Sequence, residues 1–468
     1  MRRLADRLVR LIARTATLGW FRAVEVTGLE RIPRTGPVLL VANHHGGFVD
    51  PSLIVATVPR PVRFLAMASL FRILPLRPLL AFAAVIPVRR AQDAEGRGGG
   101  TRRNVDAFAA CFAHLREGGA IGLFPEGEAS DEPHLLPIRT GAARIALGAH
   151  SRGAMGLRIV PVGLIYEDKQ RARSRAYVRV GEPIAMDEDL ATNPSVPPDE
   201  TDRDAVAALT SAISARLRDA ALDFRSAEQR SALRLAANVA LRWEHGDPRG
   251  RPPVGEVDRL ADRLSESPAA AEGAVRSAAI EYREGLEAAG VPDAVVTPGA
   301  DEALARRSRI GWLLTLALAP LAAVGLAANA APAIAVYAVG RRPMPPVTHA
   351  TAKFLTAIAA FLANWAALRW WVFDDTAHPW LLTLATGPAC GLVALWCVGR
   401  AIRARRARIG LRKLAAASGV LEDLRARRAR LVDAVGAATP TTIGATADGV
   451  DLDDRRREGG AGSLDLQP

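Results

Sequence analysis

The sequence predicts an α/β domain with a mixed, mostly parallel sheet flanked by helices, followed by a helical region and C-terminal transmembrane helices. Two observations carry this prediction. Short apolar runs alternate with helical patterns over residues 24–190, as strands and helices do when helices cover a buried sheet. Apolar segments almost free of charge occupy residues 310–399, and each is near the roughly 20 residues that cross a bilayer.

The predicted strands are the β-rich apolar runs of residues 24–190. They are Val24–Gly28, Pro37–Asn43, Ala84–Val88, Ala120–Gly127, Leu157–Tyr166 and Ala176–Ile184. Helical patterns separate some of them, at Asn104–Gly119 and Arg139–Gly153. In such a domain the binding residues are expected in the loops that follow the strand ends.

Residues 1–23 precede this domain and have the spacing of an amphipathic helix, with leucines at positions 4, 8 and 11 and arginines between them. One interpretation is a helix lying on a membrane surface, with Trp20 and Phe21 as interfacial anchors. The other is a helix packed on the core of the protein. The segment is charged throughout, so it does not have the pattern of a secretory signal.

A Pro-rich, acidic linker is expected at residues 191–202, and a helical region without a chemical motif at 203–309. The membrane region, 310–399, begins with a broken or re-entrant hairpin at 310–340, because this run contains Pro320, Asn329 and Pro332. Spans are expected at 354–373 and 379–399. A basic helix at 400–435 and a disordered tail at 436–468 would complete the chain.

Arginines flank the apolar segments, whereas the short loop "DDTAH" between the two spans is acidic. Because positive residues favour the cytoplasmic side, we expect a multi-pass protein of the cytoplasmic (inner) membrane with its α/β domain facing the cytoplasm. The net charge of +12 then favours anionic membrane lipids or phosphate-bearing substrates as partners. Nucleic acid is not expected, because aromatic residues make up only 5% of the chain.

Three cysteines without a C-x-x-C pair argue against a disulfide framework and a metal site. The sequence contains no phosphate-loop or dinucleotide glycine pattern, so no bound cofactor is expected.

The motif with the most chemistry is "NHHGGFVDP", which follows the strand at Pro37–Asn43. His45 and Asp50 have the spacing H-x-x-x-x-D. A carboxylate that binds one imidazole nitrogen leaves the other as a general base, able to take the proton of a substrate hydroxyl. The alternative is a structural one, in which Asp50 and Pro51 begin a helix and the glycines form a turn.

Three other strand ends carry residues suited to the same site. Arg89 and Arg90 follow "AVIPV" and offer donors for a phosphate. Glu126 and Gly127 follow "IGLFP", where a glycine lets the backbone approach a substrate. "VPVGLIY" supplies a further strand, which contains Pro161.

The order "NHHGGFVDP", "IPVRR", "LFPEG" and "VPV" resembles the four blocks of the PlsC-type glycerolipid acyltransferase family. The resemblance covers residues 24–184. It implies that His45 is the base and Asp50 its partner, and that Pro161 shapes an acyl pocket. It also implies a phosphate site made by one or both of Arg89 and Arg90 with Glu126 and Gly127. His44 would be a neighbour of the base.

The residues after "FPEG" depart from the lysophosphatidate enzymes, and "SDEPHLLPIRTGAARIALG" is more similar to yeast-type glycerol-3-phosphate/dihydroxyacetone-phosphate acyltransferases and their bacterial relatives. Glu128 adds a carboxylate that Arg139 or Arg144 would have to offset, and Arg139 either contacts the phosphate or is a solvated residue at a helix start.

The resemblance implies an acyltransferase that uses acyl-CoA or acyl-carrier protein as co-substrate. The expected acceptor is the sn-1 hydroxyl of glycerol-3-phosphate. Alternatives are a 1-acylglycerol-3-phosphate (lysophosphatidate) acyltransferase, a non-catalytic membrane scaffold, and a channel or transporter, for which Arg369 is the one intramembrane charge.

Overall fold

The computed structural model describes residues 2–72, 77–88, 104–189, 198–244, 251–297, 312–415 and 418–439. These residues divide into two compact units. The first unit runs to Asp223 and includes Met344–Thr351, and the second takes up the described residues of Phe224–Pro343 and those from Ala352 onward.

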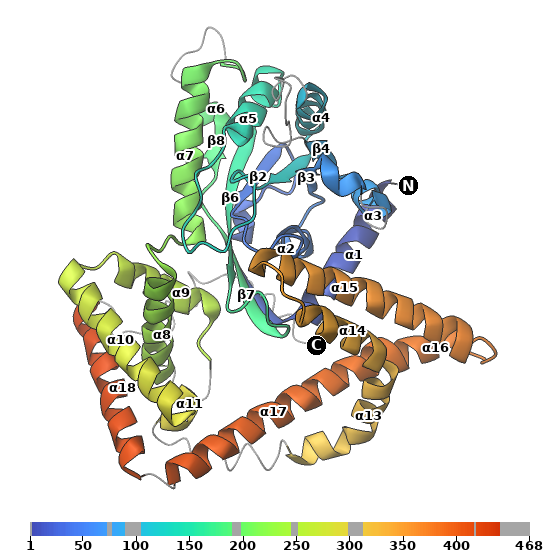
Figure 1. The fold of residues 1–468 in the computed structure, drawn as a ribbon. Helices are drawn as coiled ribbons and strands as arrows, with labels where there is room; N and C mark the ends of the chain where they lie inside the picture. The colour runs from blue at the N-terminus through green and yellow to red at the C-terminus, as the bar shows by residue number, and fades with distance from the viewer. Residues whose placement is uncertain are drawn as a thin grey trace, which may run out of the picture. The chain divides into compact units, whose positions relative to one another are not determined.

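A single sheet organises the first unit (Figure 1). Within the described residues its eight strands have the order β1-β7-β6-β2-β5-β3-β4, with β8 paired to β6. Strand β6 is antiparallel to β7 and β8, whereas the other pairs are parallel. The predicted mixed, mostly parallel sheet is therefore confirmed. The strands are β1 (Phe21–Thr27), β2 (Val38–Ala42), β3 (Arg63–Met67), β4 (Ile86–Val88), β5 (Ala120–Leu123), β6 (Arg158–Tyr166), β7 (Ser174–Val180) and β8 (Ile184–Ala185).

Helices cover both faces of this sheet. Helices α4, α5 and α7 contribute to one large core together with the odd-numbered residues of β2 and β6, such as Leu39 and Ile159. Helices α1 and α2 pack on each other, and α2 faces the even-numbered residues of β6, because its Asp50 contacts Tyr166. The helices of this unit are α1 (Arg2–Trp20), α2 (Val49–Thr57), α3 (Arg77–Phe82), α4 (Val105–Arg116), α5 (Gly141–Ser151), α6 (Met186–Asp189) and α7 (Arg203–Ala221).

Helix α1 combines features of both interpretations of the N-terminal segment. Trp20 and Phe21 are buried, with exposed fractions of 4% and 1%, so they are not interfacial anchors. Arg14 Nε donates to the carbonyl oxygen of Ala56 at 3.0 Å, which fastens α1 to α2. The leucine face nevertheless remains exposed, as Leu4, Leu8 and Leu11 show.

The boundary after the sheet differs from the prediction. Helix α7 begins at Arg203, where the separate helical region was expected, but Val206, Leu209 and Ile213 lie in the core of the sheet. An apolar stripe of this kind has to be buried, and the sheet offers the partner surface. The second unit consequently begins after Asp223.

The second unit is helical, with π-helical turns at Leu368–Val372 and Ala385–Ala389. The predicted basic helix at 400–435 is two helices: α17 runs from the apolar segment into the basic one, and α18 packs against α10. Leu424, Leu431 and Val435 of α18 are buried, so α18 is a core helix of this unit. The helices are α8 (Ala227–Glu244), α9 (Val254–Ser265), α10 (Ala269–Ala289), α11 (Asp293–Val296), α13 (Ala319–Ala328), α14 (Ala330–Gly340), α15 (Pro346–Ala367), α16 (Pro379–Leu384), α17 (Cys390–Ala415) and α18 (Ser418–Ala438).

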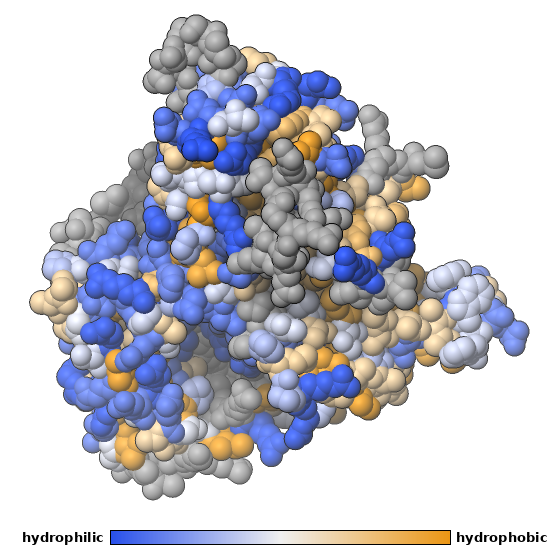
Figure 2. Space-filling model, turned by 45° about the horizontal axis from the view of Figure 1, so that its top comes forward, coloured by the Kyte–Doolittle hydropathy of each residue, from blue (hydrophilic) through white to orange (hydrophobic). Residues whose placement is uncertain are grey.

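Two helical segments, Thr348–Val372 and Pro379–Ile402, are long and apolar enough to cross a membrane. Their apolar residues are exposed in the structure, among them Leu362 and Leu381 at 52% and 64%. Figure 2 shows apolar residues on the surface of the molecule in this view. Near the end of the first segment, Arg369 lies 4.5 Å from the ring centre of Trp370 and 5.1 Å from that of Trp380, and pairs with Asp374 at 2.7 Å. Such a cluster is typical of a membrane–water interface.

The predicted break within 310–340 is present at Asn329, where α13 and α14 meet with a bend of 64°. Asn329 is 7% exposed. Its Nδ2 donates to the carbonyl oxygens of Gly325 at 2.8 Å and Gly387 at 2.9 Å, and its Oδ1 accepts from Trp365 Nε1 at 2.9 Å. These bonds satisfy the side chain and carbonyls at the break, as an apolar environment requires.

Candidate active site

The loop from Asn43 to Phe48 joins the carboxyl end of β2 to α2 and contains the candidate site. Asn43 is completely buried, and its side chain continues the pairing of β2 with β6. Its Nδ2 donates to the carbonyl oxygen of Leu164 at 3.0 Å, and its Oδ1 accepts from the amide of Leu164 at 2.7 Å. The chain therefore leaves the sheet at a fixed position one residue before the histidines.

Asp50, in the first turn of α2, is completely buried. Its Oδ2 accepts hydrogen bonds from His44 Nδ1 and from the amide of Gly46, both at 2.8 Å. Its Oδ1 accepts from the hydroxyl of Tyr166 at 2.5 Å. Burial by itself would raise the pKa of Asp50. The hydrogen bond and the charge of His44, together with the hydrogen bonds from Tyr166 and Gly46, outweigh burial and lower this pKa below its ordinary value. Asp50 is therefore an ionised carboxylate.

His44 is oriented on three sides. Its Nδ1 must carry a proton to donate to the Asp50 carboxylate, which can only accept. Its ring stacks on Phe124 with 4.0 Å between ring centres and 11° between planes, and its amide donates to Glu126 Oε1 at 2.7 Å. In this tautomer the second ring nitrogen, Nε2, has an available lone pair and points away from Asp50. That is the arrangement of a general base with an orienting carboxylate.

His45, the predicted base, has its hydrogen bonds to other groups of the loop region. Its Nδ1 lies 2.9 Å from the carbonyl oxygen of Ser130, and its own carbonyl oxygen accepts from Lys169 Nζ at 2.5 Å. The hydrogen bond to Asp50 that was predicted for His45 is formed by His44, and the role of catalytic base stays a prediction. Neighbouring side chains of an extended chain point in opposite directions, and the loop turns through Gly46 and Gly47 before α2 begins. Counting residues between His and Asp does not reveal which histidine faces the helix.

Gly46 is required by this geometry. A Cβ atom at this position would come within 2.5 Å of Asp50 Oδ1, a contact that would displace the carboxylate. The glycine thus lets the backbone approach the carboxylate closely enough for the amide of Gly46 to donate to it.

Glu126 was predicted to bind the substrate phosphate, but its contacts are with the backbone. It is 2% exposed, its Oε1 accepts from the amide of His44, and its Oε2 accepts from the amide of Leu136 at 3.2 Å. Burial raises the pKa of Glu126 to about 7, although these two amides lower it in part. The carboxyl group thus ties the histidine loop to the segment after β5, and its part in a phosphate site stays a prediction.

Gly127 and Arg139 lie together beside Glu126. Gly127 has a φ of 77°, and Arg139 Nε donates to the carbonyl oxygen of Glu126 at 3.2 Å. A Cβ on Gly127 would come within 2.7 Å of Arg139 Nε. The exposed Arg139 guanidinium is thus drawn close to the turn, where it offers donors for an anion. Arg144 instead donates to the carbonyl oxygen of Glu200 at 2.6 Å.

Three predicted site residues remain, Arg89, Arg90 and Pro161. Arg89 and Arg90 lie outside the described residues. Pro161 is buried in β6, and an added Cβ on Gly181 would come within 2.9 Å of its ring. Because side chains alternate along a strand, Pro161 points to the face opposite Tyr166. Its place in an acyl pocket stays a prediction.

Tyr166 and Lys169 are the site residues that sequence reasoning missed. Lys169 forms an ion pair with Asp131 besides its bond to the carbonyl of His45. Both belong to types that this arginine-rich chain uses rarely, with 4 tyrosines in 468 residues and lysine only at positions 169, 353 and 413. The rarity of tyrosine and lysine in this chain was the one feature of the sequence that could have drawn attention to Tyr166 and Lys169.

Comparisons with known proteins place part of the chain beside acyltransferases. Residues 23–165 match the family model described as Acyltransferase. This segment includes most of β1, all of β2 to β5 and nearly all of β6, together with His44, Asp50 and Glu126. Residues 23–165 are therefore similar to the acyltransferase family.

The chain is similar to "Glycerol-3-phosphate O-acyltransferase 2" of Saccharomyces cerevisiae, with 45% identity over 85 residues, or 18% of this chain and 11% of the relative. It is also similar to the "1-acyl-sn-glycerol-3-phosphate acyltransferase" of Borreliella burgdorferi, with 30% identity over 147 residues, 31% of this chain and 53% of the relative. The chain thus spans from about a tenth to about half of these relatives.

Among solved structures, the crystal structure of the 1-acyl-sn-glycerophosphate (LPA) acyltransferase PlsC from Thermotoga maritima aligns with a TM-score of 0.35 and 18% identity. The alignment covers 47% of this chain and 80% of that one.

Proposed function

We propose that the protein is an O-acyltransferase that moves a fatty acyl group from a thioester, acyl-CoA or acyl-carrier protein, to the sn-1 hydroxyl of glycerol-3-phosphate. The observation that carries this proposal is the His44–Asp50 hydrogen bond of 2.8 Å, set in a domain that matches the acyltransferase family. The thioester is a co-substrate, and the mechanism below uses no bound cofactor.

His44 Nε2 takes the proton of the acceptor hydroxyl while the hydroxyl oxygen attacks the thioester carbonyl carbon. The new C–O ester bond forms, the C–S bond breaks, and the leaving thiolate takes the proton back from the imidazolium. Asp50, ionised and fixed by Tyr166 and Gly46, stabilises the imidazolium between these steps. The acceptor itself replaces the serine of a Ser-His-Asp hydrolase.

The acceptor is assigned from two supports. The yeast relative of 45% identity is named for glycerol-3-phosphate, and Arg139 beside the turn at Gly127 supplies a cation for its phosphate. Arg89 and Arg90, which follow a strand end in the sequence, are proposed to add to this phosphate site. The second candidate acceptor is 1-acylglycerol-3-phosphate, because the relative of 30% identity is named for it.

We further propose that the protein lies in the cytoplasmic membrane with its α/β unit on the cytoplasmic side, in contact with anionic lipids. Arg400 and Arg405 follow the second apolar segment, whereas the loop between the two segments contains Asp374 and Asp375. A single cysteine placed at Asp374, in a variant without the native cysteines, should react with a membrane-impermeant reagent only from outside. Labelling only in inverted vesicles would contradict this orientation.

The reaction is tested with purified full-length protein in detergent and labelled acyl-CoA or acyl-carrier protein. Glycerol-3-phosphate and lysophosphatidate are offered separately. Asp50→Asn should lose most of the transfer. Asp187→Asn is the matched control, because Asp187 also binds a histidine, His150, at 2.8 Å, and it should transfer at nearly the normal rate.

The acceptor that yields an acylated product identifies the reaction. Transfer to lysophosphatidate alone would replace glycerol-3-phosphate by 1-acylglycerol-3-phosphate as the proposed acceptor. A folded wild-type protein that transfers to neither acceptor from either donor would favour a non-catalytic scaffold and refute the proposal.

A further inference from the structure

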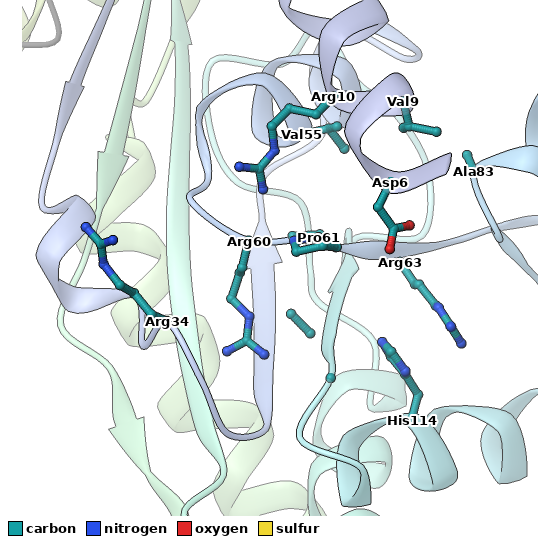
Figure 3. A pocket seen from close by; sticks show the side chains of 13 residues that line it. Asp6, Val9, Arg10, Arg34, Val55, Arg60, Pro61, Arg63, Ala83 and His114 are labelled. Carbon is teal, nitrogen blue, oxygen red and sulfur yellow. The ribbon is translucent and has the colours of Figure 1, made fainter. Parts of the chain in front are cut away.

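A basic cavity of about 250 Å³ lies in the first unit, away from the dyad (Figure 3). Its walls come from α1, from the end of α2 and the turn into β3, and from the segment between α4 and β5. The lining residues with polar side chains are Asp6, Arg10, Arg34, Arg60, Arg63 and His114.

The cavity and the dyad lie at opposite ends of the sheet. Ala120, which opens β5, and Arg63, which opens β3, line the cavity, whereas His44 and Glu126 follow the carboxyl ends of β2 and β5. A strand rises about 3.3 Å per residue, so the length of β5 alone separates the two by about 10 Å. The cavity is therefore not part of the candidate active site.

The charges around the cavity are unbalanced, with four guanidinium groups and one carboxylate, Asp6. Arg60 is 8% exposed and donates to the carbonyl oxygens of Pro33 at 2.8 Å and Gly118 at 2.7 Å. Burial lowers the pKa of Arg60, and burial together with Arg14 lowers that of Arg10. Gathered, partly buried cations of this kind are stabilised by an anion.

His114 also lines the cavity. Within the described structure its Nδ1 atom is buried and has no hydrogen-bond partner, which is costly for a polar atom. Burial and the charge of Arg63 lower the pKa of His114 to about 4, so the ring is neutral.

Helix α1 indicates where such an anion comes from. Asp6, Val9 and Arg10 face the cavity, whereas Leu4 and Leu11, on another side of the helix, are 71% and 60% exposed. One helix thus presents an apolar face next to a basic cavity, which matches the acyl chain and the phosphate of a lipid. We propose that this cavity is a second phosphate site, which binds the headgroup phosphate of an anionic lipid. The proposal is independent of the reaction proposed above.

Hydrogen exchange of the full-length protein in detergent locates the ligand, because it reports on the cavity and on the histidine loop separately. The probes are dihexanoyl phosphatidylglycerol, dihexanoyl phosphatidylcholine and inorganic phosphate. We expect phosphatidylglycerol to slow exchange in peptides around residues 58–64 and 114–120, and phosphatidylcholine to have little effect.

The test variant is the double substitution Arg34→Gln and Arg63→Gln, which removes two charges without touching the backbone bonds of Arg60. It should weaken phosphatidylglycerol binding about tenfold or more, since each charged hydrogen bond contributes substantially. Arg216→Gln, at an exposed site on α7, is the matched control and should bind normally.

Protection by inorganic phosphate at equal concentration would contradict a lipid source and indicate a soluble phosphate ligand instead. Protection that is absent, or that persists unchanged in the double variant, would overturn the site. The thermal unfolding midpoint of the double variant should remain near that of the wild type, which confirms that it is folded.

Discussion

Replacing Tyr166 by phenylalanine removes one atom from the candidate site and leaves its shape. The Tyr166 hydroxyl donates to Asp50 Oδ1 at 2.5 Å, and the Tyr166 ring is stacked on Phe21 with 5.7 Å between centres. Phenylalanine keeps the stacking and deletes one of three donors to a buried carboxylate. A hydrogen bond to a charged group contributes about 1.5–3 kcal/mol, so kcat should fall about tenfold to a hundredfold.

The same loss should be visible in stability against pH. The folded pKa of Asp50 lies below its ordinary value, so the ionised group stabilises the fold above the unfolded pKa, and this stabilisation is lost as pH falls through the folded pKa. Losing 1.5–3 kcal/mol raises the folded pKa by about one to two units. Tyr166→Phe should therefore begin to unfold in acid at a higher pH than the wild type does. Thermal unfolding of both proteins at a series of pH values measures this difference.

Tyr177→Phe is the control, because the Tyr177 hydroxyl also forms a buried hydrogen bond, to Thr27 at 2.7 Å, without contacting Asp50. It should lower stability at every pH by a similar amount and leave kcat unchanged. A Tyr166→Phe variant with wild-type kcat and a wild-type acid transition would refute the reasoning about Asp50.

Three further predictions concern the turn, the buried glutamate and the membrane region. Gly46→Ala should lower acyl transfer about a hundredfold, because its Cβ would displace the Asp50 carboxylate, whereas Gly141→Ala, with open space around it, should be neutral in the same assay. Glu126 has a folded pKa of about 7 against an ordinary 4.5, so the fold loses about 3 kcal/mol of stability as pH rises from about 4.5 to about 7, with no further loss above that. Thermal unfolding of Glu126→Gln should lack this decline, and the same decline in the variant would contradict the assignment. Asn329→Leu should lower the free energy of unfolding in detergent by about 1–2 kcal/mol through its lost interhelical hydrogen bonds, and an unchanged midpoint would show that the break is stable without them.

The sheet could be predicted because its central strands are continuous apolar runs. Strands β2, β5 and β6 are buried along nearly their whole length, and the sequence displays this directly. Strand β3 was missed, because Arg63–Met67 is short and only partly buried. Helix α7 was assigned to the wrong region, since a helical stripe shows that a partner surface exists but not which one it is.

The location of the candidate site could be predicted from the sequence, but the contacts between its residues could not. Strand ends located the loop of the histidines and the turn of Glu126, because parallel strands bring their carboxyl ends to one edge. The choice between His44 and His45 depends on how one loop turns, and Tyr166 reaches Asp50 across 116 positions of sequence. Local patterns carry neither kind of information.

The most direct test of the proposed mechanism compares two single substitutions, His44→Gln and His45→Gln, in acyl transfer by the purified full-length protein. Both should fold, which thermal unfolding checks. If His44 is the base, His44→Gln lowers kcat by about a hundredfold to ten-thousandfold, whereas His45→Gln keeps kcat within about tenfold, since a general base contributes far more than a loop contact. A variant His44→Gln that transfers at the wild-type rate, with the large loss in His45→Gln instead, would contradict the account.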